Sequence, residues 1–359
     1  MFYRLFPDHS RQPIDLQHLF GGPTVTACWV IGGGPSLNEL PIELIEASPA
    51  PKFAMNLAGS GLLRPDFWTS YDPTARFQRS IYLDASILKF VHACRAMDLI
   101  PETNFKVCEA PGVVCFDRAR QRGFAEFPCL SAHQLQRPTP ETSPAPLQAI
   151  TDWQDSFIQT IDLAYRLGFR RLYLAGCELY LSPPPVLLSL AEQHGVRYEL
   201  REPLARFLHR CRAAGIPEAD LSQCELTNQY HFDERKPFAA AVNTDEHYYR
   251  VSQYLRLSRR TLALAGLELI SVTPDSRLND YFPYSPAATA CTELLKVTGD
   301  PASEVTRGKY SLSTEPQRSG SMPMRDYRPL HWPDPRQPQL PANPSHKADY
   351  PAGVPVEVG

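Results

Sequence analysis

An apolar segment that stops abruptly at three glycines constrains the fold of this chain more than any other feature. Residues 24–31 (TVTACWVI) are mostly β-branched or apolar and lie between Gly-Pro and Gly-Gly-Gly, which predicts a short buried strand. Ser36 stands three residues before Glu39, the spacing of a capping box, so a helix is expected to begin there. Pro41 is expected at the first position of the main part of that helix, where proline is tolerated.

The turn between this strand and this helix has the composition of an anion site. Glycine allows a sharp turn and a close approach of the backbone because it has no Cβ atom. A helix start presents unpaired N–H groups to a phosphate. We therefore predict contacts to a phosphate or nucleotide from Gly32, Gly33, Gly34, Pro35 and Ser36. A tight turn without a ligand is the alternative, because the dinucleotide fingerprint has a third glycine where this chain has Leu37.

Segments typical of strands and helices alternate along the rest of the chain. Strands are predicted at residues 52–56, 67–71, 87–92, 105–108, 171–175 and 267–272. Helices are predicted at residues 156–168, 184–215 and 243–265. This alternation predicts an α/β fold with a Rossmann-like, doubly wound and mostly parallel sheet.

Polar residues and glycines follow several of the predicted strands. In a doubly wound sheet, ligands bind outside the carboxyl ends of the strands. These ends carry the glycine loop, Asn56, Asp72, Gly176, Glu178, Thr273 and Ser276. We expect these residues to converge on one site.

Composition divides the chain into three parts. We expect an N-terminal arm at residues 1–23 and an α/β domain at 24–314, with a helical insertion at about 182–240. Proline, with 36 residues, is the compositional outlier and is concentrated in residues 315–359. We expect this last part to be an extended proline-rich tail, which is a candidate for homo-oligomer contacts or assembly.

Charge and hydrophobicity exclude several classes of protein. With a net charge of −3, neither nucleic acid nor a membrane is an expected partner. No run approaches the roughly 18 apolar residues of a membrane span, and the N-terminal residues MFYRLFPDHSRQ lack the apolar core of a signal peptide. The nine cysteines form no C-x-x-C pair, which favours reduced thiols and a cytoplasmic location.

Several of these segments, taken in order, resemble one protein family. The loop VIGGGPSLNE (30–39), the segment RPDFWTSYD (64–72) and residues 156–178 resemble the MptE-like family, the 6-hydroxymethylpterin pyrophosphokinase-like proteins. That family also covers the motility accessory factors that modify flagellin, and its glycine loop is similar to that of certain bacterial sialyltransferases. His231-Phe232 and residues 271–283 (SVTPDSRLNDYFP) resemble elements of bacterial and phage homologues.

This resemblance spans roughly residues 25–285. It implies a Rossmann-like fold and transfer chemistry on a nucleotide or nucleotide-sugar donor, with Mg²⁺ as a further candidate cofactor. Glu178 stands where the family usually has Asp, and residues 182–229 depart from its pattern, so the acceptor is not identified.

Two carboxylates and one histidine are the candidates for metal binding and catalysis. Asp72 and Glu178 are predicted to hold Mg²⁺ together with diphosphate oxygens, because hard cations favour carboxylates. A helix cap before Pro73 is the alternative for Asp72. The resemblance places His231 near the site, and histidine titrates near neutral pH, so His231 is the candidate general base. A surface histidine is the alternative.

Four polar residues and a glycine are candidates for binding the donor. Asn56 is predicted to contact a base or ribose, or else to form a turn that bonds its own backbone. Ser156 is predicted to contact phosphate, or else only to cap a helix. Thr273 and Ser276 are predicted to bind ribose or phosphate, with an ordinary Pro-Asp turn as the alternative. Gly176 follows the 171–175 strand and completes the set.

Two classes of function therefore stay open. The first is a transferase that binds a nucleotide or nucleotide-sugar and moves a glycosyl or diphosphoryl group. The second is a catalytically inactive structural or assembly protein on the same fold, for example a component of a phage particle, which places the chain in a virion. An NAD(P)-dependent oxidoreductase is a weaker third reading, because residues 52–56 lack the acidic residue expected to contact a ribose.

Overall fold

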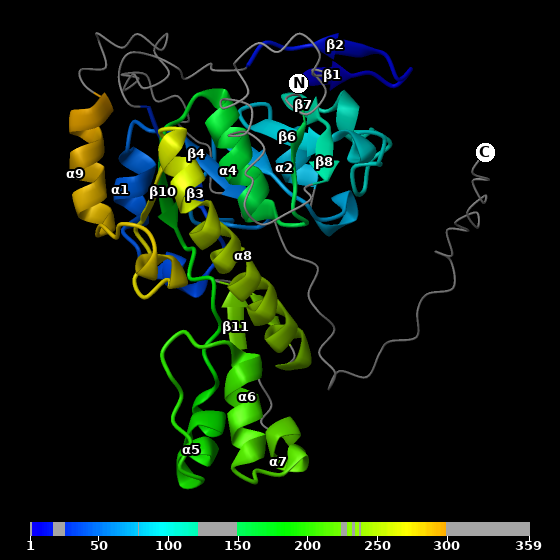
Figure 1. Ribbon diagram of the computed structural model, residues 1–359. Helices are drawn as coiled ribbons and strands as arrows, with labels where there is room; N and C mark the ends of the chain where they lie inside the picture. The colour runs from blue at the N-terminus through cyan, green and yellow to red at the C-terminus, as the bar shows by residue number, and fades with distance from the viewer. Residues whose placement is uncertain are drawn as a thin grey trace, which may run out of the picture.

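A sheet of nine strands lies at the centre of the computed structural model (Figure 1). The structure describes residues 2–16, 26–77, 79–120, 149–223, 228–231, 234–236 and 238–298. The tail predicted at 315–359 lies outside these residues. Residues 17–25, which belong to the predicted N-terminal arm and first strand, also lie outside them.

The sheet is mixed but mostly parallel. Its strands are ordered β13 (Glu268–Ser271), β10 (Arg171–Ala175), β3 (Ala27–Ile31), β4 (Lys52–Met55), β5 (Phe67–Thr69), β6 (Leu88–His92), β7 (Val113–Phe116), β1 (Tyr3–Leu5) and β2 (Arg11–Pro13). Neighbours from β13 to β7 are parallel, whereas β1 is antiparallel to both β7 and β2. The predicted α/β class with a mostly parallel sheet is confirmed.

Helices cover both faces of this sheet. Phe67 and Trp68 are neighbours in β5, so their side chains point to opposite faces. Phe67 packs against Phe169, which closely follows α4 (Ser156–Leu167). Trp68 packs against Tyr82 of α2 (Arg79–Leu83) on the other face. Burial from both sides explains why every residue of β3 and β4 is buried, as in other parallel sheets.

Some local predictions differ from the structure. The strand expected at 105–108 is wrong, because Val107–Glu109 form the 3-10 turn η4 and Phe105 is 56% exposed. The strand β7 and the hairpin β1–β2 were not predicted from the sequence. That hairpin lies within the expected N-terminal arm and is joined to the sheet by pairing of Tyr3 with Cys115.

The order of the strands reverses between β3 and β10. The chain adds β4, β5, β6 and β7 successively on one side of β3, then returns to place β10 and β13 on its other side. The loops that follow β3 and β10 therefore lie side by side at the carboxyl edge of the sheet. In open α/β sheets, such a reversal is where ligands bind.

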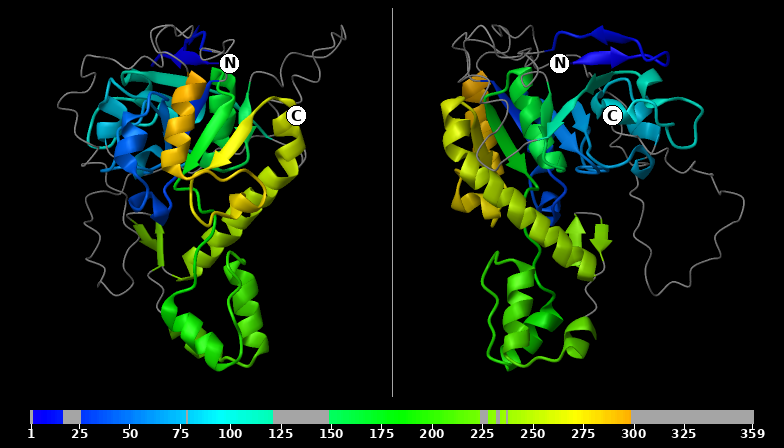
Figure 2. Two further views of the ribbon diagram at one scale, coloured as in Figure 1. Left: turned by 90° about the vertical axis from the view of Figure 1, so that its left-hand side faces the viewer. Right: turned by 45° about the vertical axis from the view of Figure 1, so that its right-hand side comes forward.

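Three helices lie apart from the sheet, in the part of the chain where a helical insertion is expected (Figures 1 and 2). They are α5 (Pro185–Gln193), α6 (Leu204–Ala213) and α7 (Glu218–Gln223). Leu187, Phe207 and Leu221 belong to their own apolar cluster. The long helix α8 (Phe238–Leu264) runs from this region back to the sheet; it begins five residues earlier than predicted. No helix in the described part of the chain is both long and apolar enough to cross a bilayer.

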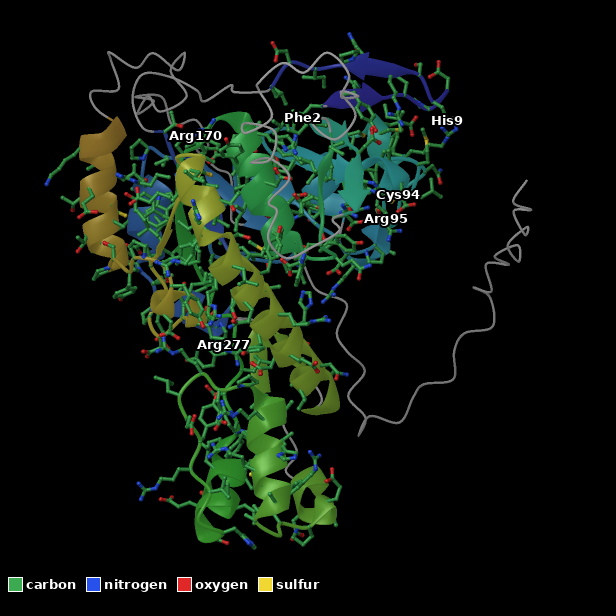
Figure 3. The ribbon with its side chains drawn as sticks, viewed as in Figure 1. Phe2, His9, Cys94, Arg95, Arg170 and Arg277 are labelled. Carbon is green, nitrogen blue, oxygen red and sulfur yellow. The ribbon has the colours of Figure 1, made fainter. Side chains whose placement is uncertain are left out.

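A buried ion pair joins these helices to the sheet. The Asp245 carboxylate of α8 lies 3.1 Å from the Arg277 guanidinium, and both side chains are almost fully buried. Asp245 also accepts hydrogen bonds from the N–H groups of Leu181 and Leu204, at the two ends of the α5 segment. Arg277 lies at the carboxyl edge of the sheet, whereas Arg170 marks the opposite edge (Figure 3).

The remaining elements are short. They are η1 (Pro35–Asn38), α1 (Ile42–Ala47), η2 (Thr74–Arg76), η3 (Ala93–Arg95), the strand pair β8 (Arg118–Arg120) and β9 (Ile150–Asp152), the hairpin β11 (Asn228–His231) and β12 (Glu234–Lys236), η6 (Arg277–Asp280) and α9 (Ala287–Thr298).

Candidate functional site

A pocket lies at the carboxyl edge of the sheet, where the strand order reverses. Its cavity volume is about 110 Å³. The loop after β3, the end of β4, the amino end of α4 and the loop after β10 form its walls, and Arg76 and Tyr248 complete the lining. Predicted site residues that line it are Gly32, Gly33, Gly34, Pro35, Asn56, Ser156, Gly176 and Glu178.

The glycine loop packs directly against the loop that follows β10. The Gly32 N–H donates to the carbonyl of Ala175 at 2.7 Å, and the Gly34 N–H donates to the carbonyl of Gly176 at 2.8 Å. A Cβ atom on Gly32 would overlap the Gly176 carbonyl, and one on Gly34 would overlap the Glu178 carboxylate. The close approach of these two loops therefore explains why glycine stands at both positions.

The capping box predicted at Ser36 is wrong. The turn η1 begins after Gly34, no side chain caps it, and the Ser36 hydroxyl is buried without a partner among the described residues. The Ser36 N–H instead donates to the Glu178 carboxylate at 2.6 Å. Burial raises the pKa of Glu178 above its ordinary value, and the hydrogen bond from Ser36 opposes this shift.

These contacts leave few free donors in the glycine loop. The N–H groups of Gly32, Gly34 and Ser36 are bonded within the protein, and Pro35 has no N–H. The Gly33 N–H has no partner among the described residues. The loop thus offers one backbone donor to the pocket, and an internal carboxylate lies where the turn was predicted to hold phosphate.

The amino end of α4 provides further donors. Asp155 caps this helix by accepting from the Ile158 N–H at 2.8 Å, and its other oxygen lies 2.9 Å from Nε2 of His247. Ser156 and Phe157 occupy the first turn and line the pocket. Because α4 has 12 residues, its dipole places partial positive charge at this end.

Asn56 and Ser156 connect three elements at the rim of the pocket. The Asn56 Oδ1 accepts from the hydroxyls of Ser70 at 2.6 Å and Ser156 at 2.9 Å. The Ser156 hydroxyl in turn accepts from the Tyr71 N–H at 2.9 Å. Asn56 has a φ of 52°, in the left-handed region that asparagine tolerates better than most residues. The Ser156 hydroxyl is therefore engaged in structure, while the Asn56 amide Nδ2 has no partner in the described part of the chain.

Arg76 is the cationic side chain in the lining of the pocket. Its guanidinium lies 2.9 Å from the carboxylate of Asp72, four residues earlier. Asp72 itself is not part of the lining. Among the described residues, no group of three or more His, Cys, Asp or Glu side chains is arranged to hold a metal ion. The structure thus gives Asp72 an arginine partner rather than a second carboxylate.

Thr273 and Ser276 lie behind the pocket rather than in it. The Thr273 hydroxyl accepts from the Cys177 N–H at 2.9 Å, and the Ser276 hydroxyl donates to the Cys177 carbonyl at 2.6 Å. Both side chains are fully buried. They fix the loop after β10, in which Gly176 adopts a φ of 65°.

His231 ends β11, whose backbone lies beside η1 of the glycine loop. Its side chain is outside what the structure describes, so its role as a base stays a prediction. Arg76, Tyr248 and the Asp155–His247 pair are site residues that were not predicted from the sequence. Arg76 had a local signal, since it stands four residues after Asp72, whereas α8 reaches the site only through the tertiary fold.

Comparison of the chain with models of known families, with characterised proteins and with solved structures gives no match.

Proposed function

We propose that this pocket binds the phosphate groups of a nucleotide or nucleotide-sugar, and that the protein is a Rossmann-like transferase of glycosyl or diphosphoryl groups. One observation carries the proposal. The amino end of α4 and the loop after β3 meet across one pocket at the reversal of strand order, with Arg76 in its lining. Helix amino ends and arginine are the groups that commonly bind phosphate.

The donors suit the charge that develops during such a transfer. The Gly33 N–H, the first turn of α4 and Arg76 all surround the pocket. Preorganised donors of this kind stabilise negative charge on a leaving phosphate without reorganisation. In this proposal they orient the donor and stabilise the departing diphosphate, while His231 is the candidate base that activates an acceptor hydroxyl.

The size of the pocket limits what it holds. Sites that enclose a drug-sized ligand have volumes of about 300–1,000 Å³, whereas this cavity has about 110 Å³. We therefore place a phosphate or diphosphate inside the pocket and the rest of the nucleotide outside it, along Tyr248 and the loop 176–180. Asp72 and Glu178 do not fit a shared Mg²⁺ site in this arrangement, because Asp72 is paired with Arg76 and Glu178 accepts a hydrogen bond from Ser36.

A second function is favoured by the hydrogen bond between Ser36 and Glu178. Three of the four N–H groups in the glycine loop are bonded within the protein, so the loop is complete without a ligand. This is the arrangement expected of a structural or assembly protein that keeps an enzyme-like fold. Fold alone does not decide between the two.

Thermal unfolding with CMP, CDP, UDP, GDP, ATP and NAD, each with and without Mg²⁺, tests the proposal. A ligand at one hundred times its Kd stabilises the folded state by about 2.7 kcal/mol. We expect stabilisation by at least one nucleotide and a loss of affinity of tenfold or more in Arg76→Gln. Arg95→Gln is the matched control, because Arg95 also ends a 3-10 turn and pairs with an aspartate, Asp98.

The outcomes separate the two functions. Binding that Arg76→Gln weakens, together with slow hydrolysis of ATP to AMP and diphosphate, or of a nucleotide-sugar to the nucleotide and free sugar, supports the transferase. Binding without any turnover supports a protein that has kept only the site. If no nucleotide stabilises the wild-type chain, or if both arginine variants bind equally well, the pocket is not a phosphate site.

A further inference from the structure

A carboxylate and an imidazole are paired at the wall of the pocket at the carboxyl edge. Asp155, the residue before α4, lines the pocket, and its Oδ2 lies 2.9 Å from Nε2 of His247 in α8. Tyr248, the next residue of α8, lines the pocket as well. The pair therefore stands where α8 meets the amino end of α4, although its members are 92 residues apart in the chain.

The pairing leaves one nitrogen of the imidazole available. Both oxygens of Asp155 are engaged, because Oδ1 accepts from the Ile158 N–H at 2.8 Å and Oδ2 faces His247. The His247 ring lies beside that of Trp153, with 6.3 Å between the ring centroids, and its side chain is 28% exposed. Its Nδ1 has no partner in the described part of the chain. The ring can therefore gain a proton there while its hydrogen bond to Asp155 is kept.

The charge of Asp155 lies beside the donors that face the pocket. Ser156 and Phe157 form the first turn of α4 and line the pocket, and their N–H groups have no partner within the helix. A phosphate that binds these groups lies close to the carboxylate of the preceding residue, and like charges repel each other. Protonation of His247 compensates the charge of Asp155, whereas a neutral His247 leaves it uncompensated.

The other charged or titratable side chains around the pair belong to three groups. Those that line the pocket are Arg76, Cys177, Glu178, Tyr180 and Tyr248. Those on α8 within four positions of His247 are Asp245, Glu246, Tyr248, Tyr249 and Arg250. The segment that leads into α4 adds Asp152, which interacts with Tyr71. Among the described side chains, only Asp155 is hydrogen-bonded to His247, so its charge acts most directly on the imidazole.

We propose that binding of a diphosphate group in this pocket is coupled to protonation of His247, which makes His247 a positioning residue of the site. The proposal rests on the proposed function, because it requires the phosphate to lie at the amino end of α4. As the diphosphate binds, Nδ1 of His247 takes up a proton from solvent, and the pair with Asp155 becomes neutral overall. Such a coupling is reciprocal, so protonation strengthens diphosphate binding by the same factor. The affinity therefore rises as the pH falls through the range in which histidine titrates.

Isothermal titration calorimetry of the full chain with inorganic diphosphate tests the coupling at pH 6 and pH 8. Diphosphate itself titrates, so we compare the ratio of its affinities at the two pH values between variants, which cancels the titration of the ligand. Glutamine at position 247 can keep the hydrogen bond to Asp155 but cannot gain a proton. We expect this ratio to be at least threefold larger for wild type than for His247→Gln. The control His209→Gln, which changes an exposed histidine of α6, is expected to match wild type.

Proton NMR of the imidazole gives an independent measure. The His247 resonance, assigned by its absence in His247→Gln, is expected to titrate at a higher pH when diphosphate is bound. A threefold coupling corresponds to a rise of about 0.5 pH unit in its midpoint. An unchanged midpoint in the presence of saturating diphosphate overturns the proposal.

A variant of the carboxylate completes the test. Asp155→Asn removes the negative charge and keeps the helix cap, because asparagine caps helices as well as aspartate does. We expect it to bind diphosphate more tightly than wild type at pH 8. Weaker binding by this variant, or equal pH ratios in wild type and His247→Gln, overturns the coupling while the phosphate site stands. If diphosphate binds the wild-type chain at neither pH, the proposed phosphate site fails together with the coupling.

Discussion

The Glu178 carboxylate accepts a hydrogen bond of 2.6 Å from the backbone N–H of Ser36, although 142 residues separate them in the chain. This contact ties the loop after β10 to the loop after β3 at the reversal of strand order. An anion that approached the first turn of η1 would meet a carboxylate there. In the proposed function, the phosphate therefore lies at Gly33 and the amino end of α4.

The pH dependence of stability reports on this buried carboxylate. Burial raises the pKa of Glu178 above the unfolded value of about 4.5, so the folded state holds its proton more tightly than the unfolded state. Its contribution to stability is present below pH 4.5 and is lost as pH rises through the folded pKa. Glutamine does not ionise, so the Glu178→Gln variant does not lose this contribution. We therefore expect the free energy of unfolding of Glu178→Gln to rise relative to that of wild type between pH 4.5 and 8.

Urea unfolding across this pH range measures the effect. Glu39→Gln is the control, because Glu39 is an exposed carboxylate close to the same turn. Parallel pH profiles for wild type and Glu178→Gln would show that the charge of Glu178 is not destabilised by its burial.

Two glycines of the loop are expected to respond differently to alanine. A Cβ on Gly34 meets the end of the flexible Glu178 side chain, which can move, whereas one on Gly32 meets the Gly176 carbonyl, which cannot move alone. Overpacking costs about 1–3 kcal/mol. We expect Gly32→Ala to lower the free energy of unfolding by the upper end of this range or more, and Gly34→Ala to lower it by less. Adding Glu178→Ala should restore part of the stability of Gly34→Ala and none of that of Gly32→Ala.

Chemical denaturation of the single and double variants completes this thermodynamic cycle. The coupling energy between Gly34→Ala and Glu178→Ala is expected to reach at least about 0.5 kcal/mol, the lower limit for residues in contact. Strict additivity of these two substitutions would contradict the packing seen between the loops.

The sequence predicted which residues lie at the carboxyl edge of the sheet better than it predicted the hydrogen bonds that their side chains make. Asn56, Gly176 and Glu178 line one pocket because parallel strands all end at the same edge, and strand ends are visible in the hydrophobic pattern. Thr273 and Ser276 also follow a strand at this edge, yet their hydroxyls are hydrogen-bonded to the backbone of Cys177. The direction of a side chain at a strand end depends on the loop that follows, and no local pattern encodes it.

Other predictions failed because the partner of a segment is distant in the sequence. Glu39 is the local partner that a capping box requires, but Glu178 bonds the turn instead. The hairpin β1–β2 was missed because its pairing with Cys115 joins segments more than 100 residues apart. By contrast, α4 was predicted at residues 156–168 with its terminal Gly168, since the signals are adjacent to the helix, although the cap is Asp155 and not Ser156.

A second pH effect is expected from His92 at the end of β6. Burial and the nearby guanidinium of Arg118 lower the pKa of His92 to about 4, against an ordinary value of about 6.5. The folded state therefore binds fewer protons than the unfolded state, and the stabilising contribution present above pH 6.5 is lost as pH falls toward 4. We expect His92→Gln to lose less stability than wild type between pH 7 and 5, whereas the exposed control His209→Gln behaves like wild type.

Proton NMR of the imidazole gives a direct check. The His92 resonance should not shift between pH 8 and 5.5, while that of an exposed histidine titrates in this range. A midpoint for His92 near pH 6.5 would contradict the burial and the charge environment described for this ring.

The strongest effect on stability is expected at the junction between the sheet and the helices α5 to α7. Asp245→Ala leaves the Arg277 charge buried without its carboxylate and leaves the N–H groups of Leu181 and Leu204 without an acceptor. Breaking one side of a buried pair costs about 3–5 kcal/mol.

Urea denaturation of matched variants isolates this contribution. Glu218→Ala, which breaks an exposed ion pair with Arg212, should change stability little. Replacing both partners, in Asp245→Asn with Arg277→Met, should recover part of the loss because no unpaired charge stays buried. If Asp245→Ala is as mild as Glu218→Ala, water must reach this junction, and the contact between α8 and the sheet is looser than the structure describes.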